Sequence, residues 1–151
     1  MNYAGTVDIN AARQTVWDFL LDVDRFSACM PGVEDLNRLD DRNFTGTMKA
    51  KVGPFTGAFE FQAEIVESEP PATLSAHVAG QDTVTKSTMT SDIAMTLAEL
   101  GPQQTQLSYQ AVVDVKGRLA IIGDLVIRAT GAQVINEFFR RLCEQIEATG
   151  R

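Results

Sequence analysis

The sequence is poor in residues that bind transition metals. Its 151 residues include one histidine, His77, and two cysteines, Cys29 and Cys143, which lie far apart along the chain. No Cys-x-x-Cys spacing and no Cys/His cluster occurs, so a metal site is not expected. Both cysteines are typical of the buried thiols of a cytosolic protein.

Positive charge is also scarce. Thirteen Lys and Arg residues stand against twenty Asp and Glu, which gives a net charge of -7. Nucleic-acid binding is therefore not expected, because no basic stripe is available to neutralise phosphates. The acidity mainly indicates a soluble surface.

Long apolar runs are missing. No stretch approaches the roughly 18 apolar residues that a membrane-spanning helix requires. The first eight residues have neither a basic start nor an apolar run, so they do not form a signal peptide, and we expect a cytoplasmic protein. The length leaves room for one domain, residues 1–151.

Catalytic motifs are absent as well. His77 lies on the polar face of an expected strand, where a solvated side chain is the usual outcome. The glycine-containing segment 53–57 lacks the Lys-Ser/Thr of a phosphate-binding loop, and the segment 85–88 lacks the preceding glycines. No nucleophile with an adjacent base is visible, so we expect no catalytic residue and no enzyme activity.

The sequence does contain a clear succession of elements. A strand over 3–9 is followed by two short helices, the first opening after Asn10 and the second covering 22–30. Apolar residues then alternate with polar ones, which predicts consecutive strands over 44–52, 55–65, 74–78, 89–97 and 107–115. Short turns between one-sided strands indicate an antiparallel meander. We predict an α+β fold in which a curved sheet of about seven strands wraps around a long C-terminal helix over about 118–147.

That helix combines two patterns. Its second half has one apolar stripe, formed by Ile135, Phe138, Phe139, Leu142, Cys143 and Ile146. Its first half, 119–127, is apolar nearly all round, apart from Asp124, which could pair with Arg128 one turn later. In a straight helix this pair would face the sheet together with Phe139. Because buried charges are costly, either the pair lines a wet cavity or the helix bends near Gly131.

The apolar segment 119–127 has too few burial partners for a helix that lies on the surface. Such a surface is typical of a peripheral membrane contact, a ligand entrance or a protein interface. Cover by flanking loops, or by a second copy in a homodimer, is the alternative.

The inward face of the sheet combines large, soft side chains with small ones. Residues such as Gly46, Gly57, Ser87, Ser91 and Ala111 would leave volume unfilled, which favours an apolar cavity, although an ordinary packed core is the alternative. The candidate ligand-binding residues are Met48, Phe59, Phe61, Met89, Ser91, Met95, Tyr109, Ile122, Asp124, Leu125, Arg128 and Phe139.

The order of elements resembles the helix-grip fold of the START and birch-allergen-like superfamily. Three local sequences resemble, more specifically, the family of the G subunit of carbon monoxide dehydrogenase: PGVE over 31–34, KAKVGPFTG over 49–57 and GRLAIIG over 117–123. The resemblance covers essentially the whole chain, and these motifs are structural rather than catalytic.

The resemblance implies an accessory carrier or adaptor of a molybdenum-containing dehydrogenase. Its cavity would hold an apolar small molecule, a quinone or another lipid, and the protein would help couple the enzyme to the inner face of the membrane. The sequence ends at Arg151 without the C-terminal extension of longer members, so segment 119–127 is the expected membrane contact. Two alternatives stay open: an aromatase/cyclase-like enzyme that uses Tyr109 or the Asp124–Arg128 pair on a polyketide-like substrate, and a structural partner without a ligand.

Overall fold

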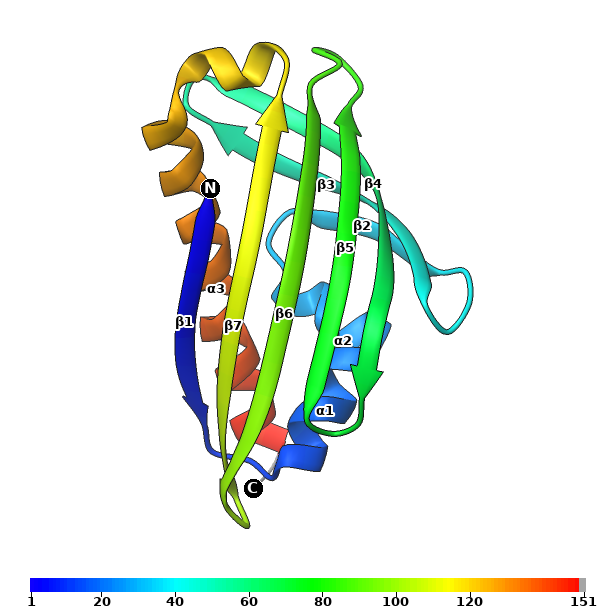
Figure 1. Ribbon diagram of the computed structural model, residues 1–151, viewed down its shortest axis with the longest axis vertical. Helices are drawn as coiled ribbons and strands as arrows, with labels where there is room; N and C mark the ends of the chain where they lie inside the picture. Colours follow the sequence, from blue (N-terminus) through cyan, green and yellow to red (C-terminus); the bar gives the residue numbers. More distant parts are fainter. Residues whose placement is uncertain (150–151) are drawn as a thin grey trace.

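A computed structural model describes residues 1–149; the last two residues of the expected domain lie outside the described part. The elements follow one another as β1 (Asn2–Ile9), α1 (Arg13–Leu21), α2 (Val23–Cys29), β2 (Val33–Arg38), β3 (Asn43–Val52), β4 (Phe55–Glu69), β5 (Thr73–Asp82), β6 (Thr88–Gly101), β7 (Gln104–Lys116), a 3-10 helix η1 (Arg118–Ile122) and α3 (Asp124–Thr149) (Figure 1).

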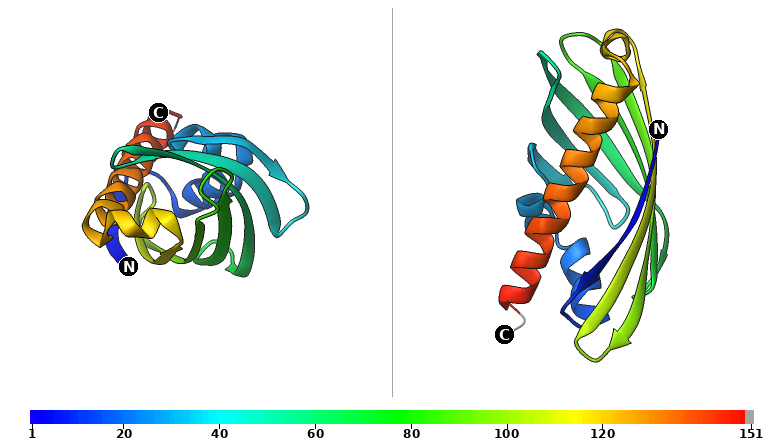
Figure 2. Two further views of the ribbon diagram at one scale, coloured as in Figure 1. Left: turned by 90° about the horizontal axis from the view of Figure 1, so that it is seen from above. Right: turned by 90° about the vertical axis from the view of Figure 1, so that its left-hand side faces the viewer.

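The strands form one antiparallel sheet. Their spatial order is β1-β7-β6-β5-β4-β3-β2. Strand β1 pairs with β7, and the members of each other pair are consecutive in the sequence. The sheet curves, and α3 crosses its concave side obliquely (Figure 2). The predicted α+β helix-grip architecture, with two short helices after the first strand, is confirmed.

Strand β2 is the one strand that alternation did not locate. Its apolar residues Val33 and Leu36 are three positions apart because the pairing with β3 shifts register between Glu34 and Asn37. Asp35 has a φ of 52° within this irregularity. A bulge of this kind removes the period of two on which a strand prediction depends.

The packed core lies at the end of the molecule that holds α1, α2 and the C-terminal half of α3. Ile9, Phe19, Leu107, Leu142 and Ile146 are all fully buried there. Leu142 and Ile146 belong to the predicted stripe of the last helix, which packs against the sheet as expected. These side chains are tightly packed, and the cavity described below borders this core at Leu20 and Leu74.

The predicted single helix over 118–147 is wrong at its start. Residues Arg118–Ile122 form the 3-10 helix η1, and α3 begins only at Asp124. Gly117 and Gly123 flank η1 with φ values of 99° and 105°, which only glycine adopts at low cost. The break therefore lies at Gly123, and α3 continues through Gly131 without interruption.

Candidate functional site

A cavity of about 360 Å³ lies between the concave side of the sheet and the N-terminal half of α3. Every strand and helix contributes to its wall, including Leu119 of η1 and Ile127 of α3. Nearly all of the lining surface is apolar. Such a space favours an apolar molecule, because transfer of apolar surface out of water is what stabilises the bound state.

Six of the twelve predicted ligand-binding residues line this cavity. They come from three strands of the meander: Met48, Phe59, Phe61, Met89, Ser91 and Met95. Ser91 is buried among apolar neighbours and is one of the few polar groups in the wall. The alternation of inward and outward residues was sufficient to place this part of the wall.

The other six residues do not line the cavity. Tyr109 stacks on Phe139, with ring centroids 5.0 Å apart, and Phe139 packs edge-on against Phe138 of the core. Ile122 is half-buried in η1, and Leu125 is 84% exposed. For Ile122 and Leu125 the reason is the break at Gly123, which turns the start of α3 away from the position that a continuous helix would give it. Tyr109 and Phe139 instead stack on each other against the packed core.

The Asp124–Arg128 pair also requires correction. Both side chains are exposed, and the described residues contain no ion pair between them. Here α3 runs along the edge strand β1, where Tyr3 Oη donates a hydrogen bond to the backbone oxygen of Arg128 at 3.1 Å. The face of α3 that is buried at Leu142 is therefore exposed at Arg128, beside the edge of the sheet.

The small inward residues have two different roles. A Cβ atom at Gly46 would lie 2.8 Å from Phe61 Cζ, and one at Gly57 would lie 3.0 Å from Phe59 Cε2. These two glycines make room for the rings of the cavity wall and leave no empty volume. Ser91 and Ala111 do line the cavity, as expected of small residues that leave space.

One side of the cavity wall was not anticipated. It is built by α1, α2 and β2 and comprises Leu20, Leu21, Val23, Phe26, Met30, Val33 and Leu36. The apolar spacing of the two short helices was visible in the sequence. What the sequence did not show is that these helices cover the cavity from the side of β2, because their position depends on tertiary contacts.

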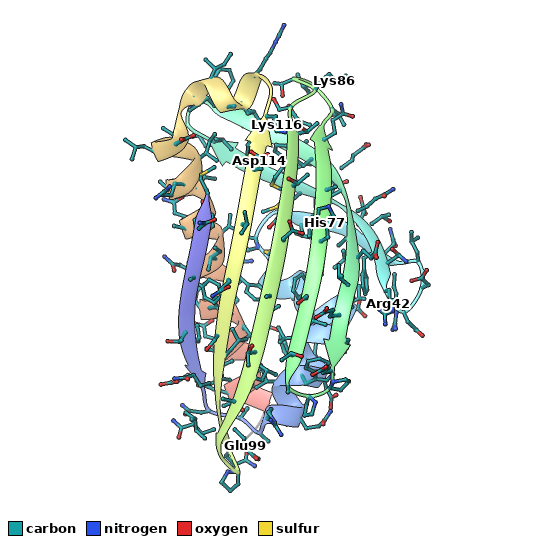
Figure 3. All side chains as sticks on the ribbon, in the orientation of Figure 1. Arg42, His77, Lys86, Glu99, Asp114 and Lys116 are labelled. Atoms are coloured by element: carbon teal, nitrogen blue, oxygen red, sulfur yellow. The ribbon has the colours of Figure 1, made fainter. Side chains whose placement is uncertain are left out.

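The cavity wall offers little acid–base chemistry, since Tyr3 and Glu64 are the titratable residues among the described residues that line it, and Glu64 is exposed. The Thr130 hydroxyl already donates to the backbone oxygen of Val126 at 2.9 Å. His77 lies on the outer face of the sheet, where its Nδ1 is 2.6 Å from Asp92 Oδ1 (Figure 3). The site can thus enclose an apolar molecule and exclude water, and His77 is remote from it.

A buried carboxylate, Asp82, lies outside the cavity near its η1 end. Asp82 accepts hydrogen bonds from the backbone N–H groups of Ala58 at 3.0 Å and Thr85 at 2.9 Å, and from the Thr85 hydroxyl. Burial raises the pKa of Asp82, but these hydrogen bonds outweigh it and hold the pKa below its ordinary value. The same cluster continues to Ser87, whose Oγ accepts the Leu119 N–H at 3.0 Å. It thereby fixes Leu119, which is almost fully buried against the cavity.

The surface around this end is apolar and basic. We call Phe55, Val84, Ile121 and Leu125 the apolar tip; the last three, exposed by 80 to 84%, are the most exposed large apolar residues described. They come from the start of β4, the β5–β6 turn and the η1–α3 segment. Residues 51–56, 82–88 and 114–128 contain five Lys or Arg and three Asp, in a chain of net charge -7. Lys86 and Lys116 lie at this end and Glu99 at the opposite one (Figure 3).

A second, shallower depression lies between β1 and α3. This side groove, of about 330 Å³, is lined by Asn2, Tyr3, Ala4, Tyr109, Arg128, Ala132, Ile135 and Asn136. Tyr3 and Ile135 also line the cavity, so the two spaces share a wall. Burial raises the pKa of the Tyr3 phenol, and the neighbouring Arg128 partly offsets that rise.

Comparison with known proteins gives a family and a fold. The model of the CoxG family, described as the G subunit of carbon monoxide dehydrogenase, matches residues 5–147. No curated protein matches the sequence with significant similarity.

Several solved structures have the same fold. A conserved protein from Geobacillus kaustophilus has a TM-score of 0.90 at 20% identity, with 100% of this chain and 98% of that chain covered. A START superfamily protein from Mycobacterium smegmatis has a TM-score of 0.73 at 14% identity over 98% of both chains. The ZhuI aromatase/cyclase from Streptomyces sp. R1128 has a TM-score of 0.72 at 14% identity, covering 100% of this chain and 96% of that one. At these identities the likeness is one of fold.

Proposed function

The chain belongs to the CoxG family of carbon monoxide dehydrogenase, whose members are accessory rather than catalytic subunits, and on that basis we propose that it carries an apolar ligand for a molybdenum-containing dehydrogenase. The observation that supports the proposal is the apolar cavity of about 360 Å³ between sheet and helix. Ligand sites in proteins typically occupy about 300–1,000 Å³ and are lined mainly by apolar side chains.

The ligand that fits this wall best is a quinone or another lipid-like molecule. Phe59 and Phe61 present aromatic rings to the cavity, and Met48, Met89 and Met95 present flexible thioethers. Aromatic and methionine side chains adapt to flat rings and to aliphatic tails. A strongly hydrophilic ligand would lose its hydration here without comparable hydrogen bonds in return.

The apolar tip supports a role at the membrane. Its side chains could enter the interface of a bilayer, while the surrounding Lys and Arg residues face anionic head groups. We place the protein in the cytoplasm, at the inner face of the membrane, with the η1 end of the cavity turned toward the lipid. No helix of the described chain is both long and apolar enough to cross a bilayer.

The carrier proposal is tested by recovering the ligand. We expect an organic extract of the purified protein to contain a quinone or lipid, detected by mass spectrometry. Ala76→Phe places a ring inside the cavity and should reduce the amount recovered. Ala94→Phe, on the exposed outward face of neighbouring β6, is the matched control and should leave it unchanged.

Two results would count against the proposal. Wild-type protein that is recovered empty and does not bind an added decyl-substituted benzoquinone would contradict it. Copurification of the dehydrogenase with a wild-type protein that is itself empty would favour the structural-partner alternative. If the dehydrogenase copurified equally well with an empty Ala76→Phe variant, complex formation would not need the ligand. The aromatase/cyclase alternative is less favoured, because Tyr109 and Arg128 line the side groove and Asp124 lies on the surface, so none of the three lines the cavity.

A further inference from the structure

We propose that the Ser91 hydroxyl orients the ligand inside the cavity, through a hydrogen bond to one oxygen of an otherwise apolar, uncharged molecule. This inference rests on the proposed carrier function and narrows the class of ligand for the same site. The class comprises neutral molecules whose apolar body carries a carbonyl or hydroxyl oxygen.

Ser91 is a polar residue in an apolar part of the cavity wall. The residue is only 6% exposed and lines the cavity from β6. In the strand register it lies between Val78 of β5 and Val113 of β7, and Met89 and Ile93 flank it two positions away along β6. All four of these neighbours line the cavity as well. The sheet thus surrounds the hydroxyl with apolar side chains.

The Ser91 hydroxyl is free and reaches the cavity. Within residues 1–149 it forms no hydrogen bond, and no completely enclosed side-chain nitrogen or oxygen atom of these residues lacks a partner. The hydroxyl is therefore not completely enclosed, and the open space beside it is the cavity that Ser91 lines. A ligand that fills this space either offers the hydroxyl a partner or buries it unsatisfied, which is unfavourable.

The other polar side chains of the wall are already engaged or exposed. The Thr130 and Tyr3 hydroxyls donate to backbone oxygen atoms of α3 at 2.9 and 3.1 Å. Glu64 is exposed, and its carboxylate has no proton to donate when ionised. Among the described residues of the wall, Ser91 therefore has the one side-chain hydroxyl whose proton is available to a ligand.

The wall also favours an uncharged ligand. No Lys, Arg or His is among the described residues that line the cavity. A carboxylate or phosphate beside one neutral hydroxyl would lose its hydration without gaining an opposite charge. A serine hydroxyl can donate to a carbonyl oxygen, and it can donate to or accept from a ligand hydroxyl. A single neutral oxygen function is therefore what Ser91 matches.

The test uses two probes that differ in one group. Decanophenone and decylbenzene have the same carbon skeleton, but the first has a carbonyl where the second has a methylene. Displacement of the neutral dye Nile red from the purified protein reports binding of each probe. For Ser91→Ala we expect binding of decanophenone to weaken about fivefold, as for loss of one neutral hydrogen bond. Decylbenzene should bind within about twofold of wild type, because it makes no hydrogen bond.

The conservative variant Ser91→Thr keeps the hydroxyl. It should preserve the wild-type ratio of the two affinities, and a ratio as low as that of Ser91→Ala would contradict the role of the hydroxyl.

An infrared spectrum of bound decanophenone, isotope-labelled at the carbonyl carbon, reports the hydrogen bond directly. A hydrogen bond to the carbonyl oxygen lowers the C=O stretching frequency. In Ser91→Ala the frequency should therefore rise toward its value in an alkane solvent. An unchanged frequency would contradict the proposed bond.

Two further substitutions are the matched controls. Ser108→Ala removes a hydroxyl from β7 at a position outside the cavity, and it should change binding of neither probe. Val78→Ala removes apolar surface directly beside Ser91 and should weaken both probes alike.

The charge of the ligand is tested with methyl laurate and laurate at about pH 8, where the carboxyl group of laurate is ionised. Wild type should bind the neutral ester at least about tenfold more tightly, because the wall offers the carboxylate no opposite charge. Equal binding of the two would overturn the assignment of an uncharged ligand.

Unchanged binding of decanophenone in Ser91→Ala would overturn the inference and leave the carrier function intact. Equal weakening of decanophenone and decylbenzene would also overturn it, since Ser91 would then act on the packing of the wall. Failure of wild type to bind either probe would instead contradict the carrier function.

Discussion

At the scale of single residues, Asp82 shows how a charge stabilises an apolar site without entering it. The carboxylate is almost completely buried, yet it accepts hydrogen bonds from the backbone of β4, from the backbone of the β5–β6 turn and from the Thr85 hydroxyl. These bonds, and the Ser87 hydroxyl beyond them, join the β5–β6 turn to the start of η1. The position of Leu119 against the cavity therefore depends on a polar cluster outside it.

Replacement of Asp82 by Asn should lower the free energy of unfolding by about 1–3 kcal/mol, since buried partners lose a charged acceptor. The folded-state pKa of Asp82 lies below its ordinary value. Its stabilising effect is therefore present above about pH 4 and is lost as the pH falls further, because the folded state must then take up a proton against its hydrogen bonds. Urea unfolding of Asp82→Asn between about pH 3 and pH 6, a range that brackets the ordinary carboxyl pKa, should show a weaker acid dependence than wild type.

The exposed carboxylate of Asp8 offers the matched control. Asp8→Asn should leave both the stability at neutral pH and its acid dependence near wild type. Equal stability and equal acid dependence in the two variants would mean that the hydrogen bonds of Asp82 make no net contribution to the free energy of unfolding.

At the scale of elements, the passage from β7 to α3 decides how the cavity is closed. Gly117 and Gly123, both with positive φ, let the chain make a short 3-10 helix that directs Leu119 inward and leaves Ile121 exposed. The glycines of the GRLAIIG segment are thus explained by backbone geometry.

The substitution Gly123→Ala tests how much this backbone geometry contributes to stability. A Cβ atom at position 123 would meet no atom within 4 Å, so the substitution adds backbone strain and no collision. We expect a loss of about 1–3 kcal/mol in unfolding free energy, because the φ of 105° and ψ of 151° at position 123 lie in a backbone region that is essentially confined to glycine. Gly101→Ala, with equally open surroundings and no positive φ, should change stability much less in the same denaturation experiment. Equal losses of stability in the two variants would contradict the conclusion that the backbone conformation at position 123 requires glycine.

The element scale also shows what the sequence could predict. Alternation located the inward residues of β3, β4 and β6, because the regular part of each of these strands keeps one face on the cavity. It missed β2, where the bulge between Glu34 and Asn37 removes the period. The last helix is the most instructive case: one angular face is buried at Leu142 and exposed at Arg128. Periodicity defines a face, but the partner of that face changes along the helix and is set by tertiary contacts.

At the scale of the whole molecule, apolar exposure and charge are unevenly distributed. The apolar tip and its Lys and Arg residues gather where η1 lies, whereas α1, α2 and the end of α3 lie at the opposite end (Figure 1). That opposite end carries exposed acidic residues, among them Asp18, Asp22, Asp24, Glu99 and Glu144. Near an anionic surface this distribution favours one orientation, with the tip toward the lipid and the acidic end away from it.

Cosedimentation with vesicles tests this orientation. We expect the protein to bind phosphatidylcholine vesicles that contain phosphatidylglycerol and to bind pure phosphatidylcholine less, with a decrease at high salt. The double substitution Ile121→Ser and Leu125→Ser should weaken binding at least about tenfold, since each apolar side chain contributes about 1.5–3 kcal/mol when fully withdrawn from water.

The chain provides its own control for that experiment. Leu39 and Leu100 are also large and more than half exposed, but they lie outside the three segments of the apolar tip. Replacing both by Ser removes a similar apolar surface and should leave vesicle binding unchanged. If this control variant lost binding as strongly as the tip variant, the contact would be general hydrophobic adsorption. If only the tip variant lost it, the η1 end of the molecule would face the bilayer.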